Sequence, residues 1–122
     1  MLWSYLRYVV RRKSAFRIHS PFVYGLYTKV ICGNQYEALD ALGIEREVKV
    51  SLNDALNAYL SCGDDVTMFT VGDIHGSKEN EREWDTICSH PDVILTIDLY
   101  HKGLIFNRKG MEKQNFVLKN KS

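Results

Sequence analysis

The stretch Val66–Leu118, VTMFTVGDIHGSKENEREWDTICSHPDVILTIDLYHKGLIFNRKGMEKQNFVL, decides the fold of this 122-residue chain. It opens with Val66–Val71, a β-rich apolar run between two aspartates and a glycine, which is typical of a buried strand. Ser77 can cap the helix that follows, and the glutamates in the first turns of this helix suit the helix dipole. Trp84 supplies an apolar contact of the same helix. A buried strand is therefore followed by an amphipathic helix.

The second half of the stretch predicts further strands. Val93–Tyr100 is the strongest strand pattern in the sequence, and His101-Lys102-Gly103 is a short turn that contains glycine. Leu104–Arg108 then returns antiparallel, and Asn115–Leu118 is a last short strand. With the helices that precede the stretch, this order predicts an α/β protein with N-terminal helices and a small mixed sheet.

Two helices are expected near the N-terminus. The apolar residues of Met1–Arg12 recur close to helical spacing. We expect a terminal helix that packs on the body, with a helix on a membrane surface as the alternative. Ser20 before Pro21 is typical of a helix start, and this second helix should run to about Ile31 and end near Gly33.

A polar and acidic connection separates these helices from the rest of the chain. Asn34–Val50 contains Gly43 and predicts at most one short turn of helix, over Tyr36–Leu42. A capping-box-like start at Ser51 opens a third helix, which ends near Gly63. Its expected buried face comprises Leu52, Ala55, Leu56, Tyr59 and Leu60. We therefore expect one domain over residues 1–122, made of N-terminal helices (1–33), a connection (34–50) and an α/β C-terminal half (51–122).

The charge of the chain is unevenly distributed, although the formal net charge is only +1. Residues 1–36 carry six basic side chains and no acid, whereas residues 37–98 carry fourteen acids and four bases. A basic arm on an acidic body indicates either an anionic partner or contact with the acidic face of the body itself. Nucleic acid or an anionic membrane would be such a partner. The arm residues that would contact it are Arg7, Arg11, Arg12 and Lys13.

Cysteine usage and the N-terminus indicate the compartment. Cys32, Cys62 and Cys88 are odd in number and form no C-x-x-C pair. This pattern argues against a disulfide framework or a zinc knuckle and suits a reducing cytosol. The apolar run Met1–Val10 has its charges after it and no cleavage site, so it is not typical of a signal peptide, and it is too short to span a bilayer. We expect a cytoplasmic protein without stable membrane insertion.

The hexapeptide Val71–Gly76, VGDIHG, is the candidate site because it follows a strand and precedes a helix. Asp73 and His75 have the residue types and spacing of the first metal ligands of a metallophosphoesterase. Such a centre also needs a second aspartate, an Asn-His pair and further histidines downstream. After Gly76 the chain has only His90 and His101. We therefore expect no metal site, and Asp73 is the single candidate ligand.

Two other interpretations of the same turn stay open. Gly72 and Gly76 at a helix N-terminus could hold a phosphate, although no lysine follows them and the acidic first turn would repel an anion. Alternatively, Asp73 ends the strand while His75 caps or packs, and the turn has a structural role only. His19, ahead of the second helix, could serve a site or be a hydrogen-bonded structural residue.

Two separated segments of the chain carry a resemblance to one family. The first is Arg17–Tyr24, RIHSPFVY. The second comprises Asp73-Ile74-His75, Ser77-Lys78, Trp84, Thr96–Tyr100, Gly103–Phe106, Arg108-Lys109 and Phe116–Leu118. Together they resemble the entry segment and the closing half of class I S-adenosylmethionine-dependent methyltransferases, of a Bacteroidetes type marked by HSPF and DDIH motifs. The resemblance implies a Rossmann-like fold, S-adenosylmethionine as cofactor, and Asp73 and His75 as the matching motif residues.

The chain departs from this family where the cofactor would bind. In these doubly wound enzymes the cofactor lies over a glycine-rich loop after the first strand, and an acid at the end of the second strand holds the ribose. A unit of that kind needs roughly 80 residues, but only Asn34–Val50 is available, and the chain contains no G-x-G. Gly72 and Gly76 stand where the family has aspartate and tryptophan, and in related O-methyltransferases the acid at the position of Gly72 helps bind a divalent metal. We therefore expect no cofactor and no cofactor-binding residues, with Asp73 and His75 as candidate catalytic residues.

Three hypotheses on function follow. The first is an internally deleted methyltransferase relative without S-adenosylmethionine-dependent activity. The second is a working small-molecule methyltransferase whose pocket around Asp73, His75 and His19 is completed by self-association. The third is a binding module that uses the basic arm on nucleic acid or anionic lipid. Because the deletion would leave the Val66–Val71 strand with an unpaired edge, we also expect a homodimer, or an exchanged element, that covers this edge.

Overall fold

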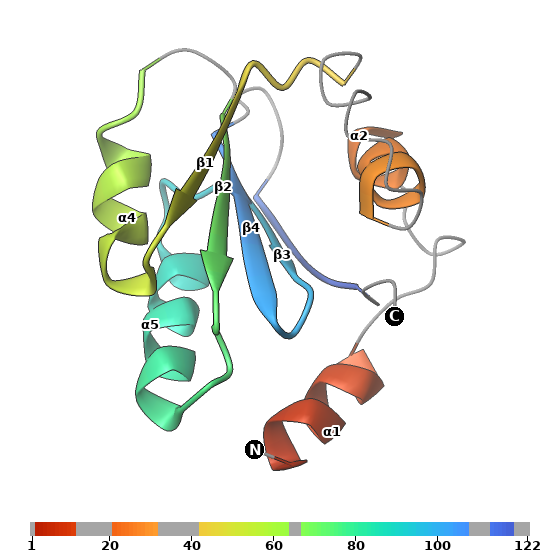
Figure 1. Ribbon diagram of the computed structural model, residues 1–122, viewed down its shortest axis with the longest axis vertical. Helices are drawn as coiled ribbons and strands as arrows, with labels where there is room; N and C mark the ends of the chain where they lie inside the picture. Colours follow the sequence, from red (N-terminus) through yellow and green to blue (C-terminus); the bar gives the residue numbers. More distant parts are fainter. Residues whose placement is uncertain (1, 12–20, 32–41, 64–66, 108–112, 119–122) are drawn as a thin grey trace.

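The computed structural model describes residues 2–11, 21–31, 42–63, 67–107 and 113–118, which form a five-stranded mixed sheet with helices on both faces (Figure 1). In spatial order the strands are β1 (Arg46–Val50), β2 (Thr67–Gly72), β4 (Lys102–Phe106), β3 (Leu95–Asp98) and β5 (Gln114–Val117). β1 is parallel to β2 and β3 is parallel to β5, whereas β4 is antiparallel to both β2 and β3. The α/β class and the mixed sheet expected from the sequence are confirmed.

Helices lie on both faces of this sheet. One face carries α4 (Leu52–Leu60) and α5 (Lys78–Ser89), and the other carries α2 (Pro21–Gly25), which continues as the π-helix η2 (Leu26–Ile31) (Figure 1). The N-terminal α1 (Leu2–Arg11) lies below the sheet in this view, at the end where β2 finishes. This arrangement leaves the carboxyl end of β2 next to α1.

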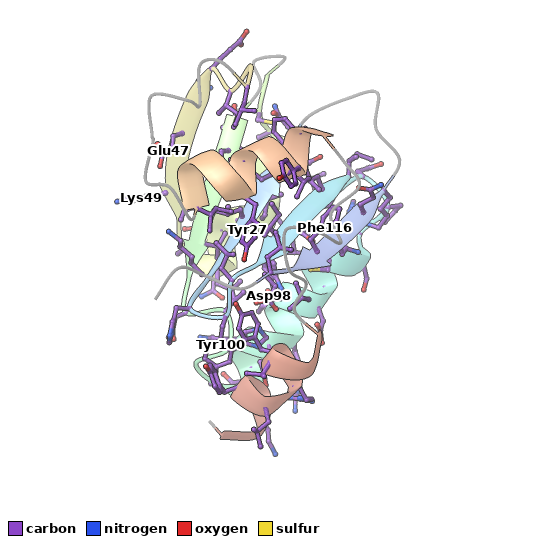
Figure 2. The ribbon with its side chains drawn as sticks, turned by 90° about the vertical axis from the view of Figure 1, so that its right-hand side faces the viewer. Tyr27, Glu47, Lys49, Asp98, Tyr100 and Phe116 are labelled. Atoms are coloured by element: carbon purple, nitrogen blue, oxygen red, sulfur yellow. The ribbon has the colours of Figure 1, made fainter. Side chains whose placement is uncertain are left out.

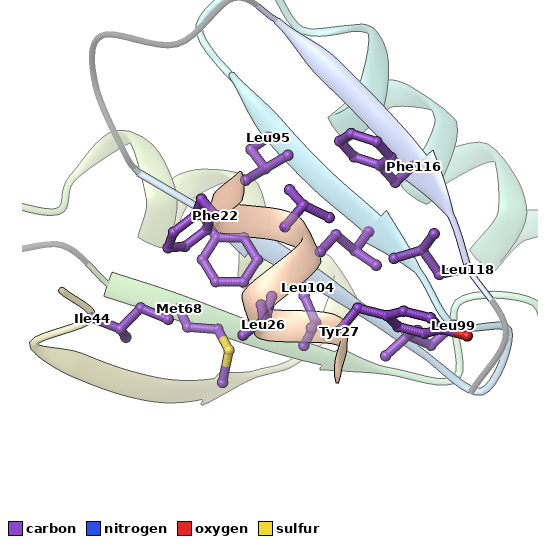
Figure 3. Packing of buried hydrophobic residues seen from close by; sticks show 13 residues of the cluster. Phe22, Leu26, Tyr27, Ile44, Met68, Leu95, Leu99, Leu104, Phe116 and Leu118 are labelled. Atoms are coloured by element: carbon purple, nitrogen blue, oxygen red, sulfur yellow. The ribbon is translucent and has the colours of Figure 1, made fainter. Parts of the chain in front are cut away.

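The buried side chains form two clusters, one on each face of the sheet. On β2, Met68 belongs to the cluster under α2, whereas Phe69 belongs to the cluster under α4 and α5. Leu104 and Ile105 of β4 alternate in the same way. Figure 3 shows the α2-side cluster, in which α2 and η2 pack across the strands. Burial on both faces explains why the central strands are apolar at successive positions instead of alternating.

The predicted helices are present. α1, the helix from Pro21 to Ile31 and the helices after Ser51 and Ser77 are confirmed. Ser77 accepts a hydrogen bond from the Asn80 backbone N–H at 3.0 Å, as an N-cap does. Ser51 also precedes its helix, but its hydroxyl donates to the Asp54 carboxylate at 2.8 Å and does not cap a backbone N–H.

α1 packs on the body as expected. The Tyr8 hydroxyl donates a hydrogen bond to the Leu118 carbonyl. The rings of Tyr5 and Tyr8 contact the ring of Tyr100, with centroids 5.1 and 5.3 Å apart. Among the described residues, no helix combines the length and apolar character that crossing a bilayer requires.

β1 corrects the expectation that residues 34–50 form a connection. Arg46–Val50 is a strand whose Val48 and Val50 pack on the α4 side, while its other side chains are exposed. A short strand at the margin of a sheet, buried on one face only, has too few apolar residues to be distinguished from a polar connection. The helical turn expected over Tyr36–Leu42 lies outside the described residues except for its last position.

The expected unpaired edge of Val66–Val71 is also wrong. β2 pairs with β1 on one side and with β4 on the other, so the described part of the chain leaves it no free edge. Self-association of the chain stays a prediction, but β2 does not provide the surface for it.

Smaller differences concern the ends of elements. β4 begins at Lys102 rather than Leu104, because the reversal takes place over Leu99–His101. On α4, Ala55 and Tyr59 are buried as expected, but Leu60 is 48% exposed. His19, Ser20, Cys32 and the basic residues 12 and 13 lie outside the described residues.

Candidate functional site

The candidate site lies at the carboxyl ends of β2 and β3. Both strands are antiparallel to β4, which lies between them. They therefore run in the same direction, and their carboxyl termini lie at the same end of the sheet. Gly103 of β4 is in register with Val71 on one side and with Asp98 on the other. The turn after β2 and the last residue of β3 are therefore separated by one strand. The carboxyl end of the strands is where open α/β sheets usually bind ligands.

His75 lies between two carboxylates at this end of the sheet. Its Nδ1 is 2.6 Å from Glu81 Oε2, and its Nε2 is 2.7 Å from Asp98 Oδ2. The side chain of His75 is 14% exposed, that of Glu81 15% and that of Asp98 9%. We call Glu81, His75 and Asp98 the ion triad. It joins the turn after β2, the first turns of α5 and the end of β3.

The geometry of the ion triad favours the imidazolium form of His75. An ionised carboxylate only accepts hydrogen bonds, so both contacts are satisfied together only when both ring nitrogens carry a proton. Burial acts to lower the pKa of His75, but the hydrogen bonds to Asp98 and Glu81 and their negative charges outweigh it, so that the pKa is raised. The ring of Tyr100 stacks on the imidazole with centroids 5.0 Å apart and an interplanar angle of 14°, which also suits a cation.

Because the folded pKa of His75 is raised, the ion triad should make stability depend on pH. Its contribution is complete below the ordinary histidine pKa of about 6.5 and is lost as the pH rises through the higher folded pKa. We expect the free energy of unfolding, measured by urea titration, to fall with increasing pH above about 6.5. The His75→Gln variant should show a flatter profile over the same range. A wild-type profile no steeper than that of the variant would contradict the assignment.

Two residues beside the ion triad have a backbone conformation that is unusual for non-glycine residues. Asp73 has φ = 57° and Tyr100 has φ = 69°, and no other non-glycine residue in the described ranges has a positive φ. The Asp73 N–H donates to the His101 carbonyl at 2.9 Å, and the Tyr100 N–H donates to Asp98 Oδ1 at 2.8 Å. Such strain persists only where surrounding contacts hold it, and it concentrates at functional sites.

The structure brings only one of the two candidate catalytic residues into the site. His75 is the centre of the ion triad, whereas Asp73 is exposed and its carboxylate lies over Gly76. Among the described residues no ion pair joins Asp73 to the triad. A Cβ on residue 76 would lie 2.2 Å from the Asp73 Oδ1. Glycine at position 76 therefore makes room for the Asp73 carboxylate, and a larger side chain there would displace it.

Neither a metal nor a phosphate is favoured by this arrangement. Among the described residues there is no group of three or more His, Cys, Asp or Glu side chains able to hold a metal ion. The ion triad does not form one because the two nitrogens of His75 point to opposite carboxylates and do not converge on one point. Glu79 and Glu81 in the first turn of α5 oppose an anion at this helix N-terminus.

Reasoning from the sequence missed Glu81, Asp98 and Tyr100 as members of the site. Asp98 did carry a signal, since it is the one acid at the end of a strongly apolar strand and a buried carboxylate needs a partner. Glu81 carried none, because its position relative to His75 depends on the turn between β2 and α5. Arg7 of α1 pairs with Glu81 at 3.4 Å, so the basic arm contacts the acidic body. Figure 2 shows Asp98 and Tyr100 at the end of the sheet beside α1.

A small pocket of about 220 Å³ adjoins the ion triad between α5 and the strands β3 and β5. Its lining comprises His75, Trp84, Asp85, Cys88, Ser89, Thr96, Asp98, Asn115, Phe116 and Val117. Thr96 Oγ1 donates to Asn115 Oδ1 at 2.5 Å, and Asn115 Nδ2 donates to the Cys88 carbonyl at 3.3 Å. Burial raises the pKa of Cys88 to about 11, which keeps the thiol protonated and unreactive at neutral pH. The pocket is smaller than typical ligand sites of roughly 300–1,000 Å³, and the polar groups of Cys88, Thr96 and Asn115 in its lining bond to one another.

Comparison with known proteins assigns no family to this geometry. No protein-family model matches the sequence, and neither a curated protein nor a solved structure is found to match it. The interpretation of the site therefore rests on the contacts of its own residues.

Proposed function

We propose that this chain is an internally deleted relative of class I S-adenosylmethionine-dependent methyltransferases that has lost methyl transfer and persists as a non-catalytic α/β domain. The observation that carries the proposal is the short connection between β1 and α4. In the family, the cofactor lies over a glycine-rich loop between a strand and a helix. Here Ser51 alone separates the end of β1 from the start of α4, and that turn has no glycine. β1 is also the outermost strand, so in the described residues no further strand beside it offers such a loop.

The state of His75 supports the same conclusion. A general base needs a ring nitrogen that is free to take a proton from a substrate. Both nitrogens of His75 are already within 2.7 Å of carboxylate oxygens, and its raised pKa favours the protonated form. Asp73 lies outside the ion triad. His75 is therefore better explained as part of a structural ion network, and Asp73 as the residue that ends the strand, than as a catalytic pair.

The proposal predicts that the protein does not bind the cofactor of the family. Calorimetric titration of the folded protein with S-adenosylmethionine, and separately with S-adenosylhomocysteine, should give no heat beyond that of dilution. A cooperative urea unfolding curve on the same preparation shows that the protein is folded. Saturable binding with a micromolar Kd for either compound would overturn the proposal.

A working small-molecule methyltransferase is the second candidate, because His75 and Asp98 both line the pocket beside α5. In that case, the titration should detect binding, and the His75→Gln variant should abolish turnover. The third candidate, a basic arm for nucleic acid or anionic lipid, is less well supported. Arg7 is the arm residue whose side chain the structure describes, and it already pairs with Glu81.

A further inference from the structure

β1 forms a margin of the sheet with charges of both signs. It pairs with β2 on one side, and within the described residues no strand pairs with its other side. Val48 and Val50 pack on the α4 side, so Glu47 and Lys49 point to the opposite face. Both charged side chains are exposed, and no ion pair with another described residue involves them. Figure 2 shows Glu47 and Lys49 at the margin of the sheet far from Phe116.

The order of these charges is self-complementary in an antiparallel pair. When two copies of one strand pair about a two-fold axis at Val48, residue 47 of each copy lies opposite residue 49 of the other. Two Glu–Lys pairs then form on one face, while the valines of both copies remain on the α4 face. Directly opposite side chains in such a pair are about 5 Å apart and interact.

Other registers are disfavoured by the same sequence. A shift of the axis to residue 47 places Glu47 opposite Glu47, and a shift to residue 49 places Lys49 opposite Lys49. A slip of one residue would pair odd-numbered residues of one copy with even-numbered residues of the other. It would put the valines of one copy on the exposed face. The register about Val48 is therefore the one in which Glu47 and Lys49 of both copies all face an opposite charge.

We propose that two copies of this chain associate through the free side of β1, antiparallel and centred on Val48, so that the five-stranded sheet of one copy continues into that of the other. Edge strands are often protected from pairing by charges, especially lysine. A lysine without a nearby acid would repel a second copy, whereas Glu47 and Lys49 together attract one. The surface differs from the β2 edge expected from the sequence. It also lies at the opposite margin from the pocket beside α5, so this association does not complete that pocket.

Charge reversal at the two positions tests the proposal. Glu47→Lys gives two lysines, and Lys49→Glu gives two glutamates, so each single variant faces like charges in its own dimer. We expect each to weaken self-association at least about tenfold, because two attractive cross-strand pairs become repulsive. Mixing the two single variants in equal amounts should restore association, since every charge then faces its opposite. The measurement is light scattering after size exclusion, over a concentration series of the full chain.

Two controls keep the result specific. Glu83→Lys makes the same change of charge at an exposed position of α5 and should leave association unchanged. Native mass spectrometry of the mixture should show a complex whose mass is the sum of one Glu47→Lys and one Lys49→Glu chain. A wild-type chain that stays monomeric over the whole series, or single variants that associate as the wild type does, would overturn the proposal.

Discussion

Replacing His75 by leucine should lower the free energy of unfolding by about 3–5 kcal/mol, which is the usual cost of removing one partner of a buried ion pair. The substitution puts an apolar side chain beside Asp98 and Glu81, so that both carboxylates lose the imidazolium and Glu81 keeps the largely exposed Arg7. Both carboxylates are at most 15% exposed. Urea unfolding followed by tryptophan fluorescence at a pH near 6 measures the loss. At this pH the imidazolium should predominate in the wild type.

His101→Leu is the matched control, because His101 is exposed and contributes its backbone carbonyl, not its ring, to the Asp73 N–H. It should change the stability by less than about 0.5 kcal/mol. In a Glu81→Gln background the cost of His75→Leu should be smaller, since one carboxylate fewer loses its contact with the imidazolium. A loss below about 1 kcal/mol in the wild-type background, as for an exposed ion pair, would show that solvent screens the ion triad.

The second large effect is expected at Trp84. Its side chain is 3% exposed and lies over Gly103 of β4, where an added Cβ would be 2.4 Å from the indole ring. Trp84→Ala should lower the free energy of unfolding by about 3–5 kcal/mol, through lost burial and the cavity that remains. Equilibrium unfolding followed by far-ultraviolet circular dichroism is the measurement, because the substitution removes a fluorescent reporter.

The contact with Gly103 makes this prediction specific. Gly103→Ala alone should cost about 1–3 kcal/mol because the methyl group overlaps the indole. In the Trp84→Ala background the same change should cost little or should stabilise, since the methyl group then enters the cavity. Gly63→Ala, where an added Cβ meets no atom within 4 Å, serves as the control. Additive costs of Trp84→Ala and Gly103→Ala would refute the packing of this ring on β4.

The elements with the strongest local patterns were predictable from the sequence. β2 and β3 are short apolar runs bounded by acids, glycine or turns, and α5 has a serine cap with glutamates in its first turn. These signals depend on neighbouring residues, so they can be recognised without knowledge of the tertiary structure. β1 was missed for the opposite reason. Only Val48 and Val50 of its five residues pack against a core, and whether a strand forms there depends on β2 lying beside it.

The composition of the candidate site was predictable only in part. The position of His75 after a strand and before a helix was visible in the sequence, and it indicated a functional or structural turn. The partners of His75 were not visible, because Glu81 lies six residues away across a turn and Asp98 lies 23 residues away on another strand. Asp73 has the same local signal as His75, but it has a positive φ, and its carboxylate lies over Gly76, where no Cβ blocks it.

The sequence by itself determined the α/β class, the order of most helices and strands, and the place of His75, because periodicity, caps and turn residues act over a few positions. The tertiary structure alone decided three further points. β1 covers the edge of β2, and the three residues of the ion triad converge at one end of the sheet. Within the described residues, β1 with Glu47 and Lys49 is one of the two outer strands. Each depends on which strands become neighbours, and that is set by packing between segments far apart in the chain.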